Sequence, residues 1–327
     1  MSNNKTILVV GGAGYIGSQT VKHLSENGYQ VIVADNLVYG HKEALDTKIP
    51  FYKADLEDIN TLRPIFKQHQ IDGVLHFAAY TYVGESVQNP QKYYKNNLKG
   101  TINLLEVMLE NNVKKIVFSS TCATYGNPQY MPMDEKHPQA PINPYGKSKY
   151  MVEQIFKDYA YAYGLKYIAL RYFNAAGADE SAQMGESHNP ETHLIPLVLR
   201  AIKGELKNIT VFGTDYDTPD GTCIRDYVHV EDLAQAHRIA LEKLDTFCGF
   251  INLGTGNGTS VKEVIAAAEK VTGKKCPVVY GARRDGDPAR LYADNKFAKE
   301  ILGWQVKYPD IESIVRTAWN WEKNKKF

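Results

Sequence analysis

Tyr145 and Lys149 are four residues apart in the string YGKSK, a spacing that puts both side chains on one face of a helix. A free tyrosine has a pKa of about 10 and is a poor base at neutral pH. A neighbouring ammonium stabilises the phenolate and lowers this pKa, so the pair can serve as a general base toward a hydroxyl. Tyrosine–lysine pairs are also common on helix surfaces, so the pair alone does not establish a site.

Three hydroxyl side chains, Ser119-Ser120-Thr121, end an apolar strand that the sequence predicts over 115–119. In an open parallel sheet, ligands bind at the carboxyl ends of the strands. We therefore expect Thr121 to hydrogen-bond the oxygen on which Tyr145 acts.

A glycine-rich string at residues 11–17, GGAGYIG, contains the spacing G-x-G-x-x-G. It follows a predicted strand, opens a predicted helix, and precedes Asp35 at the end of the next strand. The glycines let the backbone approach a pyrophosphate, and the helix N-terminus favours its charge. A carboxylate at Asp35 binds both ribose hydroxyls and repels a 2′-phosphate, which favours NAD over NADP. A tight glycine turn without a ligand is the alternative, and this context disfavours it.

Apolar and helical segments alternate through the first half of the chain. Strands are predicted at 6–10, 30–34, 50–53, 73–77, 115–119 and 166–171, and helices at 15–27, 60–70, 92–111 and 146–163. Continuous apolar strands separated by helices indicate a parallel sheet covered on both faces. We expect an α/β fold of the Rossmann type, with a doubly wound parallel sheet.

The pattern changes after Arg171 to a long polar stretch followed by shorter elements. Helices are predicted from residues 194, 231, 261, 295 and 311, and strands near 210–212, 225–230 and 250–253. We expect residues 1–173, with 226–255 folding back, to form the NAD-binding Rossmann domain. The expected second unit, residues 174–225 and 256–327, is a smaller, partly discontinuous C-terminal α/β lobe for the substrate.

The composition excludes several classes of protein. Of the 327 residues, 43% are hydrophobic and the formal net charge is +1, so no long-range field attracts nucleic acid or a membrane. The 22 tyrosines accompany no basic stripe that would bind nucleic acid. No apolar run reaches the roughly 18 residues that span a bilayer, and no secretory signal is present. The four cysteines are far apart, as expected of reduced thiols in the cytoplasm.

Together these strings resemble the extended short-chain dehydrogenase/reductase family, and within it the UDP-glucose (UDP-galactose) 4-epimerases. The resemblance covers nearly the whole chain and rests on residues 11–18, 35–37, 76–79, 83–86, 145–149, 171–174, 220–222, 224–230, 283–284 and 286–287. It implies an NAD-dependent enzyme that oxidises C4 of a UDP-sugar to a transient ketone and then returns the hydride to the other face. UDP-galactose and UDP-glucose would be interconverted with the cofactor tightly bound.

The resemblance also implies roles for individual residues. Tyr145 would be the base, with Lys149 and Thr121 as its partners. Asp35 and Asn36 would hold the adenosine ribose. The cofactor site would comprise Gly11, Gly14, Tyr15, Ile16, Gly17, Asp35, Asn36, Asp55, Leu56, Phe77, Ala78, Ala79, Asn96, Ser119, Tyr145, Lys149 and Tyr172. The UDP-sugar site would comprise Thr81, Thr121, Asn174, His193, Leu194, Phe212, Arg225, Tyr227, Arg284, Asp287 and Leu291.

Three of these positions depart from family patterns. Thr81 stands where some members have lysine, Leu291 where a bulky tyrosine can wall the sugar pocket, and His193 where some have asparagine. A sugar pocket whose wall differs at these positions could admit a larger group at C2 of the sugar. The alternatives therefore stay open: a bifunctional or GlcNAc-preferring UDP-N-acetylglucosamine 4-epimerase, or a UDP-arabinose 4-epimerase. A different class of function is an NAD-binding regulator without chemistry, which should lack the base or its lysine.

Other residues near the site are less suited to chemistry. Related enzymes that eliminate water need a carboxylate pair after the threonine, and this chain has Cys122 and Ala123 there. We interpret Cys122 as a small packed residue. His188 and His193 lack further ligands at a suitable spacing, so no metal is expected, and substrate contact or surface placement is preferred for both.

The helices predicted at 92–111 and 146–163 carry apolar stripes, such as Ile102, Leu105 and Leu109. Such stripes ordinarily pack on the sheet. The family resemblance implies that the outer faces of the two helices also pair in a homodimer.

Overall fold

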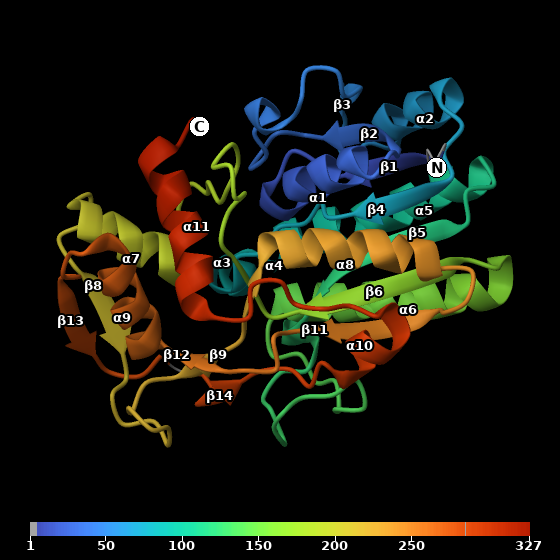
Figure 1. Cartoon of the computed structure of the whole chain (residues 1–327). Helices are drawn as coiled ribbons and strands as arrows, with labels where there is room; N and C mark the ends of the chain where they lie inside the picture. Colours follow the sequence, from blue (N-terminus) through green and yellow to red (C-terminus); the bar gives the residue numbers. More distant parts are fainter. Residues whose placement is uncertain (1–4, 285) are drawn as a thin grey trace.

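Seven parallel strands form the largest sheet of this computed structural model, which describes residues 5–284 and 286–327 (Figure 1). In spatial order they are β11 (Gly249–Leu253), β6 (Lys166–Tyr172), β5 (Lys115–Thr121), β4 (Gly73–His76), β1 (Thr6–Val10), β2 (Gln30–Asp35) and β3 (Phe51–Lys53). The chain builds outward in opposite directions from β1 and β4, which lie side by side. A crevice for ligands is expected at the carboxyl ends of these two strands. The predicted doubly wound Rossmann-type sheet is confirmed.

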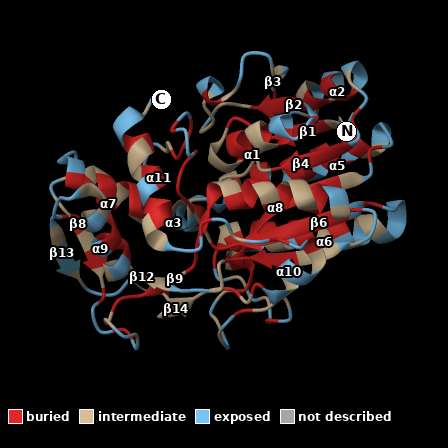
Figure 2. Ribbon diagram, viewed as in Figure 1, coloured by how far each residue is buried: buried red, intermediate tan, exposed pale blue. Residues whose placement is uncertain are grey.

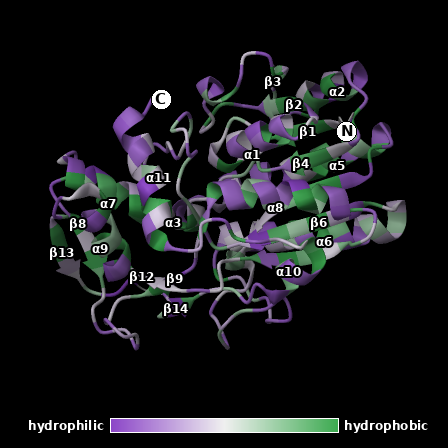
Figure 3. Ribbon diagram, viewed as in Figure 1, coloured by the Kyte–Doolittle hydropathy of each residue, from purple (hydrophilic) through white to green (hydrophobic). Residues whose placement is uncertain are grey.

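Helices cover both faces of this sheet. One face carries α1 (Tyr15–Glu26), α8 (Val230–Lys243) and α10 (Lys296–Leu302), and the other carries α2 (Ile59–Gln68), α5 (Gly100–Glu110) and α6 (Pro144–Tyr163). The strands between these layers are mostly buried and apolar, as Figures 2 and 3 show. Burial on both faces explains why their sequences are continuous apolar runs rather than alternating ones.

The start of α6 is fixed by the local sequence. Asn143 caps the helix by accepting a hydrogen bond from the Gly146 N–H at 2.8 Å, and Pro144 occupies the first turn. The helix ends at Gly164, which is left-handed at φ 72°. Tyr145 and Lys149 are thereby held on the first turns of a long helix that packs on the sheet.

The single helix predicted over 92–111 is wrong in one respect. The structure has α4 (Pro90–Tyr93), a π-helical turn η2 (Tyr94–Lys99) and then α5. A π turn inserts one extra residue between two helical segments. Within each segment the apolar residues keep their usual helical spacing, so a search for that spacing does not reveal the turn. The short helix α3 (Val83–Gln88) and the short 3-10 turns η1 (Lys42–Ala44) and η3 (Cys122–Thr124) were not predicted either.

A smaller lobe lies beside the carboxyl ends of the sheet strands, at the left of Figure 1. Its core is formed mainly by α7 (Leu194–Lys203), α9 (Val261–Thr272), α11 (Ile311–Asn324) and the parallel pair β8 (Ile209–Phe212) and β13 (Val278–Gly281). Buried side chains such as Leu199, Ala268 and Val315 meet there.

The strand predicted near 225–230 is divided at Asp226 into two short strands. β9 (Ile224–Arg225) pairs with β12 (Thr259–Ser260) and β14 (Arg290–Leu291), whereas β10 (Tyr227–His229) pairs with β7 (Asn174–Ala176). The buried Asp226 carboxylate accepts hydrogen bonds from the N–H groups of Thr255, Gly256 and Ala293. The Asp226 carboxylate thus gathers two distant backbone segments, residues 255–256 and Ala293, at the point of division, which a local pattern cannot indicate.

The chain passes between the lobes more than once. β11 joins the large sheet beside β6, and α10 and Trp304 pack in the same core as α8. The residue limits predicted from the sequence for the two domains stay a prediction. Residues 1–4 of the first domain lie outside the residues that the structure describes. Across the described residues, no helix combines the length and the apolar character needed to cross a membrane.

Candidate active site

The glycine turn after β1 is packed so closely against backbone that no side chain fits at Gly11 or Gly17. A Cβ on Gly17 would lie 2.1 Å from the Gly11 oxygen, and a Cβ on Gly11 would lie 2.4 Å from the Ala78 nitrogen. Gly11 is also left-handed, at φ 79°. Gly14 is the N-cap of α1, and no side chain caps the first N–H groups of this helix. The turn therefore fits a pyrophosphate held at a helix N-terminus.

Asp35 lies where the adenosine ribose is expected, at the end of β2. Its carboxylate accepts hydrogen bonds from the N–H groups of Ala13, at 3.0 Å, and Leu37, at 2.8 Å. Burial raises the pKa of this carboxyl, and the two backbone hydrogen bonds oppose the rise. Asn36 donates to the Asp55 carboxylate at 3.2 Å, so the residues expected around the adenosine are in contact.

The three predicted catalytic residues come together at the carboxyl end of β5. Thr121 is the last residue of that strand, and its hydroxyl acts to lower the pKa of the Tyr145 phenol. Lys149, one turn along α6, donates from its ammonium to the Ser119 backbone oxygen at 2.8 Å and lies 4.6 Å from the centre of the Phe118 ring. The strand β5 thus holds Thr121, and the helix α6 that packs beside it holds Tyr145 and Lys149.

The lowering of the Tyr145 pKa that the sequence predicted is wrong. Burial raises the pKa of Tyr145 to about 12, and the hydrogen bond from Thr121 only partly opposes this. Burial also lowers the pKa of Lys149 to about 7, so the lysine carries only part of its charge at neutral pH. The lowering would need a fully charged lysine beside the phenol, and burial leaves Lys149 only partly charged at neutral pH.

The residues expected on the nicotinamide side line the same region. Phe77 packs 4.5 Å from His237, between ring centres, and Ala78 adjoins the glycine turn. The Ser119 hydroxyl is hydrogen-bonded to Tyr172, which ends the neighbouring strand β6. The remaining residues of the predicted cofactor set are Ile16, packed on the core, Leu56 and Asn96, which are buried, and Ala79, which is half-buried.

Tyr15 joins the two lobes. Its phenol donates to the Gly177 backbone oxygen at 2.5 Å, and its ring lies edge-on to His188. Burial, followed by the nearby Glu186 and Glu191 carboxylates, raises the pKa of this phenol. The first helix of the cofactor site is thus tied to the loop that leads to α7.

The predicted UDP-sugar residues form two contacting groups and several separate positions. Arg225 pairs with Asp287, and Arg284 stacks on Phe212 at 4.0 Å from the ring centre. Leu291 packs in a cluster with Cys122, Tyr125, Met133 and Phe173. Asn174 is opposite Tyr227 in the β7–β10 pair, His193 and Leu194 are at the start of α7, and Thr81 precedes α3.

Cys122 is buried next to Thr121, as the sequence predicted. Burial raises the pKa of its thiol to about 12, which removes it as a nucleophile or proton donor near neutral pH. Ala123 offers no ionisable group. The two positions that carry acids in enzymes of the eliminating type are therefore inert here.

Two sets of residues near the site were missed from the sequence. Glu153 accepts from both Arg171 and Ser120, in a buried network one turn beyond Lys149. An acid four residues after a functional lysine on the same helix face is a signal that could have found it. Glu186 and Glu191 lie around His193 in a polar loop, where no periodic pattern indicates which side chains converge.

The sheet, the glycine turn and the tyrosine–lysine helix define an NAD-dependent enzyme of the extended short-chain dehydrogenase/reductase class. Residues 7–254 match the NAD dependent epimerase/dehydratase family, and the chain belongs to that family. It is 54% identical to the UDP-glucose 4-epimerase of Halalkalibacterium halodurans over 319 residues, which are 97% of this chain and 95% of that protein.

Solved structures of 4-epimerases are also similar to this chain. The crystal structure of UDP-glucose 4-epimerase from Brucella ovis in complex with NAD is 49% identical and superposes with a TM-score of 0.94, over 96% of this chain and 97% of that one. The UDP-Glc/GlcNAc 4-epimerase from Campylobacter jejuni is 42% identical with a TM-score of 0.87, over 98% and 100%. The cofactor of the present enzyme is NAD.

Proposed function

We propose that this enzyme interconverts UDP-galactose and UDP-glucose, with Tyr145 as the base at the 4-hydroxyl. The observation that carries the proposal is the meeting of the first turns of α6, which hold Tyr145 and Lys149, with the end of β5 at Thr121, where Lys149 donates to the Ser119 backbone oxygen. NAD, when bound, supplies the hydride acceptor and donor at C4. Tyr145 takes the hydroxyl proton as the 4-keto sugar forms and returns it when the ketone is reduced.

The neighbouring residues support this role of Tyr145. Thr121 donates its single hydroxyl proton to the phenolate, which lowers the cost of the charged form. Lys149 lies in the same face of α6 and bears a partial positive charge at neutral pH, so it stabilises the phenolate when protonated. Because Cys122 and Ala123 cannot exchange protons, the 4-keto sugar is not diverted into loss of water.

The nucleotide would be held by the smaller lobe. Arg225 and Arg284 supply charge for the two phosphates, and Asn174 and Tyr227 supply amide and hydroxyl groups at the strand pair between the lobes. Asp287 shares the Arg225 guanidinium in the structure, so binding of a diphosphate would compete with that ion pair. The sugar is free to turn over because only its UDP part is anchored.

The sugar that the enzyme accepts would depend on the size of the side chain at Leu291, in the wall of the proposed sugar pocket. Leu291 packs beside Cys122 and Phe173, next to the catalytic threonine, so its size sets the space near the sugar. A UDP-N-acetylglucosamine 4-epimerase activity is the second candidate, because a leucine leaves more room at C2 than a tyrosine. Parallel assays of UDP-galactose, UDP-N-acetylgalactosamine and UDP-arabinose, with wild type and Leu291→Tyr, decide between them. Loss of only the N-acetylated substrate in the variant supports a pocket wall at Leu291.

The test of the base is the Tyr145→Phe variant. Turnover of UDP-galactose to UDP-glucose should fall at least about a hundredfold, because general-base catalysis is lost. Tyr161→Phe, at a phenol that is 96% exposed on the same helix, is the matched control and should leave turnover unchanged. Near-normal turnover in Tyr145→Phe rules out this base. Conversion of no UDP-sugar by wild type with NAD bound would favour a regulator instead.

A homodimer is part of the proposal, with α5 and α6 as its interface. Ile102 on α5 is 37% exposed and Met151 on α6 is 41% exposed, which leaves apolar groups on the outer faces. Leu105 is fully buried against the sheet, so it belongs to the core rather than to this face. A light-scattering mass equal to one chain would contradict the dimer. The cytoplasmic location stays a prediction.

A further inference from the structure

Four side chains that can bind a metal converge in the loop between β7 and α7. Glu186, His188, Glu191 and His193 follow one another in the pattern E-x-H-x-x-E-x-H. Each offers one ligand atom, and these four atoms lie within 4.8 Å of one another. The sequence suggested no metal because two histidines alone are too few ligands, and the structure adds two carboxylates.

Both imidazoles direct the same ring nitrogen to the same place. The Nδ1 atom of His193 lies 2.7 Å from Glu186 Oε1 and 2.9 Å from Glu191 Oε1. The Nδ1 atom of His188 lies 3.1 Å from Glu186 Oε1 and 3.9 Å from Glu191 Oε2. Two nitrogens and two carboxylates thus surround one small volume.

The carboxylates of this cluster are buried. The Glu186 side chain is 7% exposed and the Glu191 side chain 1%, and Glu191 Oε2 accepts no hydrogen bond from the part of the chain that the structure describes. Two buried carboxylates are costly unless cations compensate for them. Among the described residues no lysine or arginine forms a salt bridge with either one. The N–H groups of Thr192 and His193 donate to Glu191 Oε1, and the charge of Lys325 acts on both carboxylates without direct contact. A cation in direct contact with both carboxylates must therefore come from within the cluster.

Protonated histidines are the alternative source of this compensation. Full neutralisation would need both rings to be imidazolium, with ring centres only 5.2 Å apart. Two like charges at that separation repel each other, and Glu191 Oε2 would still lack a donor. A divalent cation with two neutral imidazoles balances the two carboxylates and provides a partner for every inward-facing atom.

We propose that Glu186, His188, Glu191 and His193 bind a divalent transition-metal ion, with Zn²⁺ as the best match. Two imidazole nitrogens and two carboxylate oxygens suit the tetrahedral coordination that Zn²⁺ takes in structural sites. The proposal is independent of the sugar that the enzyme accepts.

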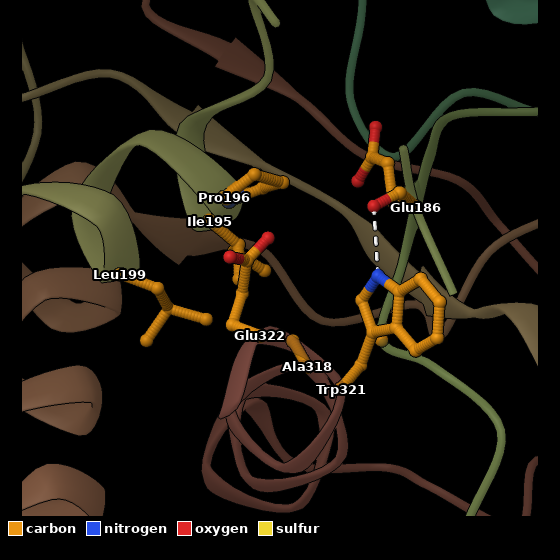
Figure 4. Close-up of a pocket in the computed structure, with 8 residues that line it drawn as sticks. Glu186, Ile195, Pro196, Leu199, Ala318, Trp321 and Glu322 are labelled. Carbon is orange, nitrogen blue, oxygen red and sulfur yellow. Dashed lines mark hydrogen bonds between the residues drawn. The ribbon is translucent and has the colours of Figure 1, made fainter. Parts of the chain in front are cut away.

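The backbone around the cluster is already held in place. The Trp321 indole donates to the Glu186 backbone oxygen at 2.9 Å, while the Glu186 carboxylate extends away from the indole (Figure 4). The Tyr82 phenol donates to the Pro190 backbone oxygen at 2.9 Å. Such contacts fix the loop that presents the ligands, so the metal would join α11, α3 and the start of α7. Its role is structural: it sets the position of His193 at the start of α7.

The test is metal binding by the full-length enzyme. After treatment with a chelator, wild type should bind one Zn²⁺ per chain in a calorimetric titration, and Co²⁺ should give the visible bands of a tetrahedral site. His188→Ala and Glu191→Gln should each weaken Zn²⁺ binding by more than the roughly 10- to 100-fold caused by loss of an outer-shell partner. His69→Ala, at the C-terminal end of α2, is the control and should bind normally.

Thermal unfolding keeps the test decisive if a variant folds poorly. Added Zn²⁺ should raise the Tm of wild type and of His69→Ala, because the ion binds only the folded state. It should leave the Tm of His188→Ala unchanged. Absence of Zn²⁺ binding by wild type, or equal binding by wild type and the Glu191→Gln variant, overturns the proposal.

Discussion

The ammonium of Lys149 donates a hydrogen bond to the backbone oxygen of Ser119, at 2.8 Å, two residues before the strand ends at Thr121. This bond links α6, which carries Tyr145, to the end of β5, which carries Thr121. Lys149 therefore holds the strand end in place and, in the proposed mechanism, supplies charge for the Tyr145 phenolate. The pKa of Lys149 can be tested through the pH dependence of stability, apart from its hydrogen bond to Ser119.

Replacement of Lys149 by methionine should change how stability depends on pH. Burial lowers the folded-state pKa of Lys149 to about 7 from the ordinary 10.5, so between these values the unfolded chain binds more protons than the folded one. The free energy of unfolding therefore rises with pH in this window, by up to about 1.4 kcal/mol per pH unit from this group. The difference between wild type and Lys149→Met, from urea unfolding of the NAD-free enzyme, should show that slope.

The exposed Lys147 on the same helix provides the control for this measurement. Lys147→Met also removes a charge from α6 but leaves the buried ammonium in place. A wild-type minus Lys149→Met difference that stays flat between about pH 7 and 10 would show that Lys149 keeps its ordinary pKa in the folded enzyme.

Replacement of Thr121 by valine should slow turnover about 10- to 100-fold, because a hydrogen bond to a charged group is worth about 1.5–3 kcal/mol. The Thr121 hydroxyl lowers the pKa of Tyr145, so its removal raises that pKa further. The acidic limb of the kcat/KM profile should then move to higher pH. Thr121→Ser keeps the hydroxyl and should restore most of the rate; equal profiles for the two variants would contradict this role.

Replacement of Gly17 by alanine should abolish tight NAD binding. The new Cβ would lie 2.1 Å from the Gly11 oxygen, so the glycine turn would have to move. Ultraviolet absorbance of the purified variant should show no bound nicotinamide, and its Tm should fall. Gly84→Ala is the control, because a Cβ there meets nothing within 4 Å. Retention of stoichiometric NAD by Gly17→Ala would refute the proposed cradle.

Replacement of Glu153 by glutamine should destabilise the enzyme by about 3–5 kcal/mol, because it leaves the buried Arg171 guanidinium without its charge partner. The wild-type carboxylate accepts from Arg171 at 2.9 and 2.7 Å. Urea unfolding measures the change. Glu110→Gln removes an exposed partner of Arg63 and should have a much smaller effect, since solvent screens that pair. Equal losses in both variants would contradict the importance of burial.

Much of the fold and of the catalytic group could be predicted because the signals are local. The apolar runs at β1, β5 and β6 are buried on both faces, so each strand is visible from its own residues. Tyr145 and Lys149 share a helix face by spacing alone. Thr121 meets them because carboxyl ends of parallel strands face one edge of the sheet.

The remainder depends on contacts between distant segments. The raised pKa of Tyr145 follows from burial by several elements, whereas the spacing to Lys149 suggested the opposite direction. The split at Asp226 follows from backbone groups about 30 to 70 residues further along the chain, as the three hydrogen bonds to its carboxylate require. Glu186 and Glu191 come together with the two histidines only through the path of a loop without periodicity.

The order of the elements along the chain has a consequence for biosynthesis. β11 closes the edge of the large sheet and Trp304 fills the core beside α8, yet both follow β8 and most of the strands that link the lobes. A ribosome therefore releases the first six sheet strands well before the residues that complete their core. The emerging amino-terminal half must wait, with part of its apolar surface uncovered, until nearly the whole polypeptide has been made.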